Sequence, residues 1–304
     1  MIAETKQLND GTKIPLIGLG TSRIENPEEI IYNSIKHGVR LIDTAFKYGN
    51  EEQIGKGIQR ALNDDKINCK REDLVIMGKV WINQRNDPEK ALRESLKRLK
   101  LNYIDIYMDH WPSGKDYGGN NFDMVPIYEF WPKMEHLVEI GLAKSIGVSN
   151  YNIQCLSNLL SITKKKPVVN EVEYHLFYIQ KTLKEFCDKQ NIAIISYYPM
   201  AHGNGARMYI KDHPELDIFQ DSMILKLSKD YDKTPGQIIL NWHYQSGCIP
   251  IPSTSKKDRM KENLASLKFD LKKEDVEALS NHFKQISLKK FCGCRRFFGV
   301  NVLA

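Results

Sequence analysis

Eight short apolar segments recur along the chain, with helical patterns between them. Their apolar residues run on mostly without alternation, which is typical of parallel strands buried on both faces. A strand and a helix repeated eight times within 304 residues predict an α/β protein, specifically a (β/α)8 TIM barrel. The segments are LIGLG (16–20), VRLIDTA (39–45), LVIMGKV (74–80), YIDIYMDHW (103–111), SIGVSN (145–150), VVNEVEY (168–174), IAIISYYP (192–199) and CIPIPS (248–253).

The segments between these strands carry the start signals of helices. In DPEKALRESLKRLK, Asp87 can cap a helix and Pro88 suits its first position. A doubly wound sheet is the rival fold for this pattern, but its dinucleotide-binding fingerprint is missing. GLGTSR (18–23) has two glycines of that fingerprint and lacks the third.

We expect one barrel domain over residues 1–304. Near its start, Asp10-Gly11 separates two strand-like segments and predicts an N-terminal β-hairpin. Residues 112–125 and 200–222 are long connections that follow strands, so we expect them at the C-terminal face, where barrel enzymes have their active sites. The tail, residues 285–304, has no helical period and is expected to fold over the same face.

The composition excludes several classes of function. The formal charge is only +6 and the lysines are scattered, which indicates a solvated surface and not a nucleic-acid-binding stripe. No apolar run approaches the roughly 20 residues of a membrane span, and no secretory signal is visible. Six cysteines without zinc-site spacing favour a reduced, cytoplasmic location. No obligate protein partner is evident, and the oligomeric state is not readable.

Polar side chains follow the apolar part of nearly every predicted strand. Asp43 ends the second strand, with Tyr48 just beyond it, while Lys79 ends the third and His110 the fourth. Because the carboxyl ends of barrel strands meet at one mouth, we expect these side chains to converge there. The later strands end in Ser149 and Asn150, Glu171 and Glu173, Tyr197 and Tyr198, and Ser253 and Thr254.

The first four of these side chains form a chemically consistent set. A neighbouring ammonium favours the phenolate of Tyr48 and lowers its pKa from the usual value of about 10, while Asp43 holds the Lys79 ammonium in place. Tyr48 could then protonate an oxygen that becomes anionic, and a neutral His110 could direct that oxygen. A carbonyl oxygen becomes anionic when a hydride reaches its carbon. No nucleophile is needed, and we expect no metal site, because the eight histidines lie far apart in the sequence.

A hydride donor would need binding groups of its own. Tyr197 offers a flat face for a nicotinamide ring. Ser149, Asn150 and a side chain of the sixth strand could anchor the carboxamide of that ring. The site therefore has candidates for both the reacting carbonyl and the reduced pyridine beside it.

Charged and aromatic residues complete this candidate site. Arg259 begins the helix after the last strand, together with Lys256 and Lys257, and could pair with a ribose phosphate. Trp81 and Trp111 are expected to line an apolar substrate pocket with His110.

The motifs that contain these residues resemble those of the aldo-keto reductase family. The similarity runs from LNDGTKIPLIGLGT (8–21) to IPSTSKKDRMKENL (251–264) and includes LIDTAFKYGNE, GKVW, DHWP, GLAKSIGVSN, NEVEYH and SYYPM. Together these motifs are highly specific. The resemblance implies a (β/α)8 fold and the reduction of aldehydes or ketones to alcohols by direct hydride transfer from NADPH.

The resemblance also implies roles for individual residues. Tyr48 would be the general acid, Lys79 and Asp43 the pair that tunes it, and His110 the residue that orients the substrate. The cofactor would be held by Thr21, Ser149, Asn150, Glu171, Tyr197, Ser253, Thr254, Arg259 and Asn263.

Three positions depart from the family pattern. Most relatives have Gln in place of Glu171, and an anion there would favour the oxidised nicotinamide unless Glu171 is protonated, so Glu171→Gln is expected to shift relative affinity toward NADPH over NADP⁺. Ser253 replaces a Lys that contacts the 2′-phosphate, which leaves NADPH as the expected cofactor and NADH as the alternative. Ser22 replaces an aromatic residue, and the physiological substrate is not indicated.

Two other functions stay open on the sequence alone. A nucleotide-binding regulatory subunit could keep the barrel with little or no turnover, and a structural packing role would need no turnover at all. The presence of all four catalytic-type residues favours the enzyme.

Overall fold

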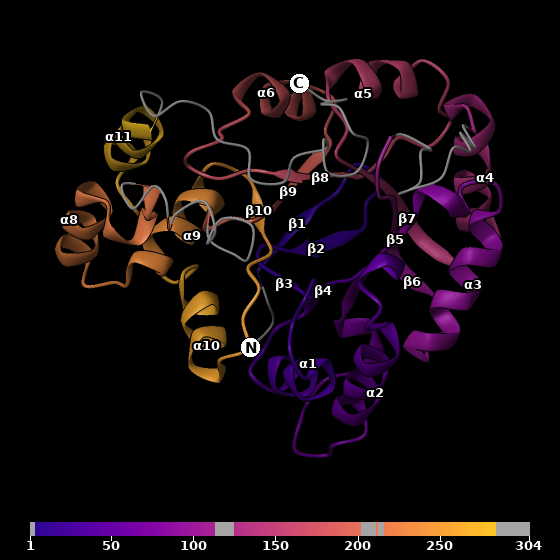
Figure 1. The fold of residues 1–304 in the computed structure, drawn as a ribbon, viewed down its shortest axis with the longest axis horizontal. Helices are drawn as coiled ribbons and strands as arrows, with labels where there is room; N and C mark the ends of the chain where they lie inside the picture. The colour runs from indigo at the N-terminus through magenta and orange to yellow at the C-terminus, as the bar shows by residue number, and fades with distance from the viewer. Residues whose placement is uncertain (1–3, 113–124, 202–210, 212–215, 284–304) are drawn as a thin grey trace.

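Eight parallel strands form one curled sheet in which each strand pairs with the next along the chain (Figure 1). The computed structural model describes residues 4–112, 125–201, 211 and 216–283. The eight predicted strands are confirmed. They are β3 (Leu19–Gly20), β4 (Leu41–Asp43), β5 (Val75–Val80), β6 (Ile104–Asp109), β7 (Ala143–Ser149), β8 (Val169–Glu173), β9 (Ala193–Tyr197) and β10 (Ile249–Pro250).

Helices surround this sheet (Figure 1). The predicted helix start is confirmed, because α3 begins at Pro88 and the Asp87 carboxylate accepts a hydrogen bond of 2.9 Å from Lys90 N. No helix among the described residues is long and apolar enough to cross a membrane. The helices are α1 (Pro27–Lys36), α2 (Glu51–Leu62), α3 (Pro88–Leu99), α4 (Ile127–Glu139), α5 (Ile153–Leu160), α6 (Lys181–Lys189), α8 (Ser222–Tyr231), α9 (Pro235–Gln245), α10 (Lys257–Ala265) and α11 (Lys273–His282).

Several segments with predicted roles lie outside the described residues. These are residues 113–124, 202–210 and 212–215, which make up most of the two long connections, and residues 284–304, which include the tail expected over the active-site face.

Backbone hydrogen bonds join the first barrel strand to the last. Gly18 N donates to Pro250 O at 3.0 Å, and Gly20 N donates to Pro252 O at 3.3 Å. A Cβ atom on Gly20 would lie 2.8 Å from the main-chain oxygen of Ile251, so only glycine permits this close approach. The sheet therefore closes on itself as the (β/α)8 prediction requires.

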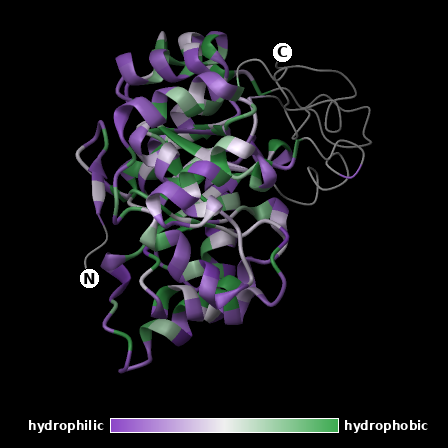
Figure 2. Ribbon diagram, turned by 90° about the vertical axis from the view of Figure 1, so that its left-hand side faces the viewer, coloured by the Kyte–Doolittle hydropathy of each residue, from purple (hydrophilic) through white to green (hydrophobic). Residues whose placement is uncertain are grey.

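Neighbouring residues of one strand pack into two different cores. Leu41 belongs to the apolar cluster inside the barrel, whereas Ile42 belongs to the larger cluster between the strands and the helices. Successive side chains of a strand point to opposite faces of the sheet. Because each face packs against an apolar core, the side chains on both faces must be apolar. This explains the continuous apolar runs of the sequence. Figure 2 shows hydrophobic residues concentrated on the strands and hydrophilic residues on the outer helices.

The predicted N-terminal hairpin is confirmed and covers one end of the barrel. Strands β1 (Thr5–Gln7) and β2 (Lys13–Pro15) pair antiparallel. Asn9 Nδ2 donates to the main-chain oxygens of Pro167 and Asn191, at 2.9 and 3.1 Å, and each of these residues lies two positions before the start of a strand, β8 and β9 respectively. The hairpin therefore lies at the N-terminal ends of the strands, which leaves their C-terminal ends for a site.

Glycines in α2 allow neighbouring helices to approach closely. A Cβ atom on Gly57 would lie 2.5 Å from the main-chain oxygen of Glu28 in α1 and 2.8 Å from Cβ of Ile31. Neither atom can rotate away, because one is backbone and the other is fixed to it. The contact between α1 and α2 therefore depends on the absence of a side chain at this position.

Gly57→Ala is expected to destabilise the protein by about 1–3 kcal/mol, because α1 must move to make room for the methyl group. Denaturant unfolding followed by circular dichroism measures this change. Gly236→Ala is the matched control, since a Cβ there would meet only side-chain atoms, the nearest 3.5 Å away. Equal effects of the two substitutions would contradict the close-packing argument.

Candidate active site

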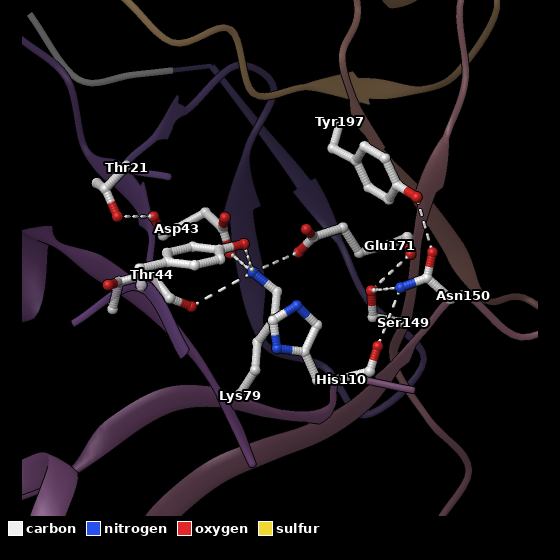
Figure 3. A network of polar contacts seen from close by, with 10 residues as sticks. Thr21, Asp43, Thr44, Lys79, His110, Ser149, Asn150, Glu171 and Tyr197 are labelled. Carbon is white, nitrogen blue, oxygen red and sulfur yellow. Dashed lines mark hydrogen bonds and ion pairs between the residues drawn. The ribbon is translucent and has the colours of Figure 1, made fainter. Parts of the chain in front are cut away.

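The ends of β4, β5 and β6 bring four predicted residues together at the C-terminal mouth of the barrel. Asp43 ends β4, and Tyr48 ends the short 3-10 helix η1 (Phe46–Tyr48) that follows it. Lys79 lies near the end of β5, and His110 directly follows β6. Figure 3 shows the Asp43 and His110 side chains close to the Lys79 amine.

The Lys79 ammonium is the centre of this group. Its Nζ atom makes a short charged hydrogen bond to Asp43 Oδ1 and also donates to Tyr48 Oη and to Thr44 O, both at 3.3 Å. Glu171 from β8 brings Oε2 to 3.2 Å from the same nitrogen. Lys79 is 1% exposed, so this cation is neutralised almost entirely by protein groups.

Burial and neighbouring charges shift the pKa values of Lys79 and Tyr48. Burial lowers the pKa of Lys79, but Asp43 and Glu171 outweigh this effect and hold the pKa above its ordinary value. Burial raises the pKa of Tyr48, and Lys79 lowers it by a smaller amount, so the net pKa lies above the ordinary value. The expected influence of Lys79 on the phenol is present, but the expected net lowering is not, because desolvation is the larger effect.

The His110 ring is positioned to act as a neutral donor. Burial, together with the charges of Lys79 and Lys47, lowers the pKa of His110 well below its ordinary value, so the imidazole is uncharged at neutral pH. Its ring meets the rings of Tyr48 and Trp81 edge to face, at centroid distances of 5.8 and 4.9 Å. The buried Nδ1 atom has no hydrogen-bond partner among the described residues.

A second predicted group is linked directly to His110. Asn150 has a left-handed backbone, with φ of 64°, and its Nδ2 donates to His110 O at 3.0 Å. Tyr197 Oη donates to Asn150 Oδ1 at 2.8 Å, and Ser149 Oγ donates to Glu171 O at 2.9 Å. Figure 3 shows Glu171 between this group and Lys79. The sequence-predicted residues of the second to seventh strands thus form one continuous site.

Thr21 belongs to the same end of the barrel but uses its hydroxyl within the protein. Its Oγ1 donates to Asp43 O at 2.8 Å. Asn50, which the sequence analysis did not single out, donates from Nδ2 to Thr21 O at 2.8 Å. These bonds fix the main chain that carries Asp43.

The residues predicted around the phosphate end of a nucleotide lie apart from this network. Thr254 Oγ1 accepts a hydrogen bond of 3.2 Å from Lys256 N, just before α10. Ser253 and Arg259 are exposed, while Asn263 is buried on α10. Among the described residues, no hydrogen bond or ion pair connects any of them to Lys79.

A buried ion cluster behind His110 is a further feature that the sequence analysis missed. Asp109 Oδ2 lies 3.6 Å from Arg85 Nη2 and accepts a hydrogen bond of 2.7 Å from Tyr151 Oη. The Arg85 guanidinium also lies over the ring of Phe130, 4.3 Å from its centroid. The only signal in the sequence was a carboxylate inside an apolar strand, next to His110. The cluster fixes the end of β6 and thereby the backbone of His110.

The Trp81 and Trp111 side chains are both buried, and the Trp81 ring contacts the His110 ring. Lys47 lies over the Trp81 ring, with Nζ 4.9 Å from its centroid. No group of three or more metal-ligating side chains occurs in the part of the chain that the structure describes.

The fold and site define a barrel oxidoreductase, and comparisons with known proteins give its family. The profile of the Aldo/keto reductase family matches residues 16–284, so the chain belongs to this family. Aldose reductase C of Dictyostelium discoideum is 36% identical, over 96% of this chain and 92% of its own. An NAD(P)H-dependent D-xylose reductase of Pyricularia oryzae is 32% identical, over 92% and 93%. The structure of a Bombyx mori aldo-keto reductase in complex with NADP superposes with a TM-score of 0.85 at 31% identity, covering 97% of this chain and 96% of that one.

Arg85→Met is expected to destabilise the protein by about 3–5 kcal/mol, because it leaves the Asp109 carboxylate buried without its cation. Burial already raises the pKa of Asp109, with Arg85 opposing the rise. Without Arg85 the folded-state pKa rises further above that of the unfolded chain, so the loss should grow as pH rises. Denaturant unfolding at several pH values measures both effects.

Arg93→Met is the control for this prediction. Arg93 makes an ion pair of 2.8 Å with Glu89 on the exposed surface of α3, and its loss should cost less than about 1 kcal/mol. A similar loss for both substitutions would contradict the importance of the buried cluster.

Proposed function

We propose that the protein reduces aldehydes or ketones to alcohols with NADPH, and that Tyr48 is the general acid. One observation carries the proposal: the buried Lys79 ammonium contacts Asp43 and the Tyr48 hydroxyl at once, with the neutral His110 ring beside them. This arrangement suits an oxygen that gains negative charge during reaction.

The residues of the mouth fit a nicotinamide nucleotide. The similar Bombyx mori protein is in complex with NADP, and the Pyricularia oryzae relative is NAD(P)H-dependent. In this chain the unpartnered Nδ1 of buried His110 marks a polar position that a ligand can satisfy. Tyr197 would support the ring, with Ser149 and Asn150 at its carboxamide.

NADPH supplies the hydride when it is bound, and the protein handles the proton. His110 donates a hydrogen bond to the carbonyl oxygen and holds it beside the phenol. Tyr48 gives its proton from Oη to that oxygen as negative charge develops. Lys79 stabilises the phenolate that remains, and Asp43 keeps Lys79 in position. Trp81 and Trp111 exclude water from the reacting carbon.

Tyr48→Phe is expected to bind NADPH normally and to lose carbonyl reduction by about 10²–10⁴-fold in kcat/KM, because the acid is removed without a change in shape. The decay of reduced-nicotinamide absorbance with a panel of aldehydes measures turnover. Tyr128→Phe is the control, since Tyr128 is 62% exposed. Full activity of Tyr48→Phe would overturn the assignment of the acid. Absence of turnover in the unmodified protein, with NADPH still bound, would favour the regulatory subunit.

Arg259→Met is expected to weaken NADPH binding by about 10–100-fold and NADH binding far less, because it removes a charged donor from the 2′-phosphate. Titration of intrinsic fluorescence with each nucleotide measures the two affinities. Lys261→Met is the matched control, as an exposed cation on the same helix. An equal loss for NADPH and NADH would contradict a phosphate contact.

A further inference from the structure

Glu171 gives the Lys79 ammonium a second carboxyl partner. Its Oε2 lies 3.2 Å from Lys79 Nζ, and Asp43 contacts the same nitrogen from β4. Glu171 and Asp43 are each 2% exposed, so solvent does not screen the charge of either carboxylate. Two buried carboxylates beside one ammonium leave an excess negative charge, and a shared proton removes it.

Burial raises the pKa of both carboxyls, and the charge of Asp43 raises that of Glu171 further, so Glu171 is the favoured holder of the proton at neutral pH. Burial and the charge of Asp43 raise the pKa of Glu171 to about 8, while Lys79 opposes the rise. Lys79 donates a hydrogen bond to Asp43 Oδ1 and makes only an ion pair with Glu171, so Asp43 is the better counter-ion. A protonated Glu171 has the size and neutrality of a glutamine, but it can also release a proton.

Within the described part of the chain, the other elements around Glu171 bring no further charge to it. Tyr48 from η1 meets the same Lys79 nitrogen, 3.3 Å away. Ser149 at the end of β7 and Asn150 just after it are both neutral. Ser149 Oγ and Asn150 N each donate to the main-chain oxygen of Glu171 at 2.9 Å. Tyr197 at the end of β9 donates to Asn150. Burial, Asp43 and Lys79 therefore govern the ionisation of Glu171.

We propose that Glu171 is the proton reservoir of the site: it resupplies Tyr48 through Lys79 after each carbonyl reduction. The proposal rests on the function proposed above. Lys79 Nζ lies between the two groups: it donates a hydrogen bond to Tyr48 Oη at 3.3 Å, and it forms an ion pair with Glu171 Oε2 at 3.2 Å.

The proton steps balance. Tyr48 loses the proton on Oη to the substrate oxygen, whose carbon has received the hydride. Lys79 gives one N–H proton to the Tyr48 phenolate, and the O–H proton of Glu171 passes to Lys79 Nζ. The phenol and the ammonium are restored, the alcohol is formed, and Glu171 is left as a carboxylate, which takes a proton from solvent before the next turnover.

These proton transfers leave the net charge of the buried site unchanged. The nucleotide becomes positive at its ring when it gives up the hydride, and Glu171 becomes negative nearby. Glu171 without its proton therefore favours NADP⁺, and Glu171 with its proton favours NADPH. Binding of NADP⁺ should expel the Glu171 proton, whereas binding of NADPH should retain it.

The test is calorimetric titration of the protein with NADP⁺ and with NADPH, in two buffers of different ionisation enthalpy. The comparison gives the number of protons released by each nucleotide. At neutral pH we expect NADP⁺ to release up to about one proton more than NADPH from the unmodified protein. Glu171→Gln should abolish this difference while still binding both nucleotides. An unchanged difference in Glu171→Gln would overturn the proposal.

A second readout uses the affinities themselves. As pH rises and Glu171 ionises, the preference for NADP⁺ over NADPH should increase by up to about tenfold per pH unit. In Glu171→Gln this preference should not change with pH. Glu173→Gln is the matched control, a buried glutamate on the same strand that pairs with His175 at 3.1 Å. It should keep the pH dependence of the unmodified protein, and loss of that dependence would contradict the role of Glu171.

The failure of this proposal differs from the failure of the proposed function. If the unmodified protein reduces carbonyls and Glu171→Gln shows the same proton release and pH profile, Glu171 is not the reservoir. If the unmodified protein neither binds NADPH nor reduces any carbonyl, the proposed function itself is wrong, and the inference fails with it.

Discussion

The buried contact between Lys79 and Asp43 is the interaction on which the site depends. It places a cation in the barrel mouth, where the loss of hydration is costly unless protein groups replace the water. Asp43, Thr44 O, Tyr48 and Glu171 supply that replacement. The same cation can stabilise a phenolate and pass a proton, so one electrostatic arrangement serves both the stability of the folded site and the proposed chemistry.

The fold holds these groups in place by closing the barrel at two points. Gly18 and Gly20 donate to main-chain oxygens of β10 and of the segment just after it, and the hairpin of β1 and β2 covers the opposite end. Strand tips that are fixed by closure cannot splay apart. Side chains from β4, β5, β6 and β8 can therefore share one desolvated volume, in which small differences in position change the balance between charged and neutral forms.

Much of this arrangement was predictable from the sequence. The continuous apolar runs gave the strands, because residues such as Leu41 and Ile42 must satisfy two cores. Polar residues at the strand ends gave the group of Asp43, Tyr48, Lys79 and His110, since parallel strands of a barrel end at one mouth. Contacts of Arg85 with Asp109 and of Glu171 with Lys79 were not predictable, because each joins residues from distant segments whose side-chain directions are set by packing.

The sequence by itself determined which elements form, the order in which they pair and which chemical groups reach the barrel mouth, because these follow from local periodicity and from strand topology. Only the tertiary structure decided that two carboxyls meet the ammonium and how deeply the phenol is buried. Those outcomes depend on distances of a few ångströms and on the exclusion of water, and neither quantity is encoded in the spacing of residues along the chain.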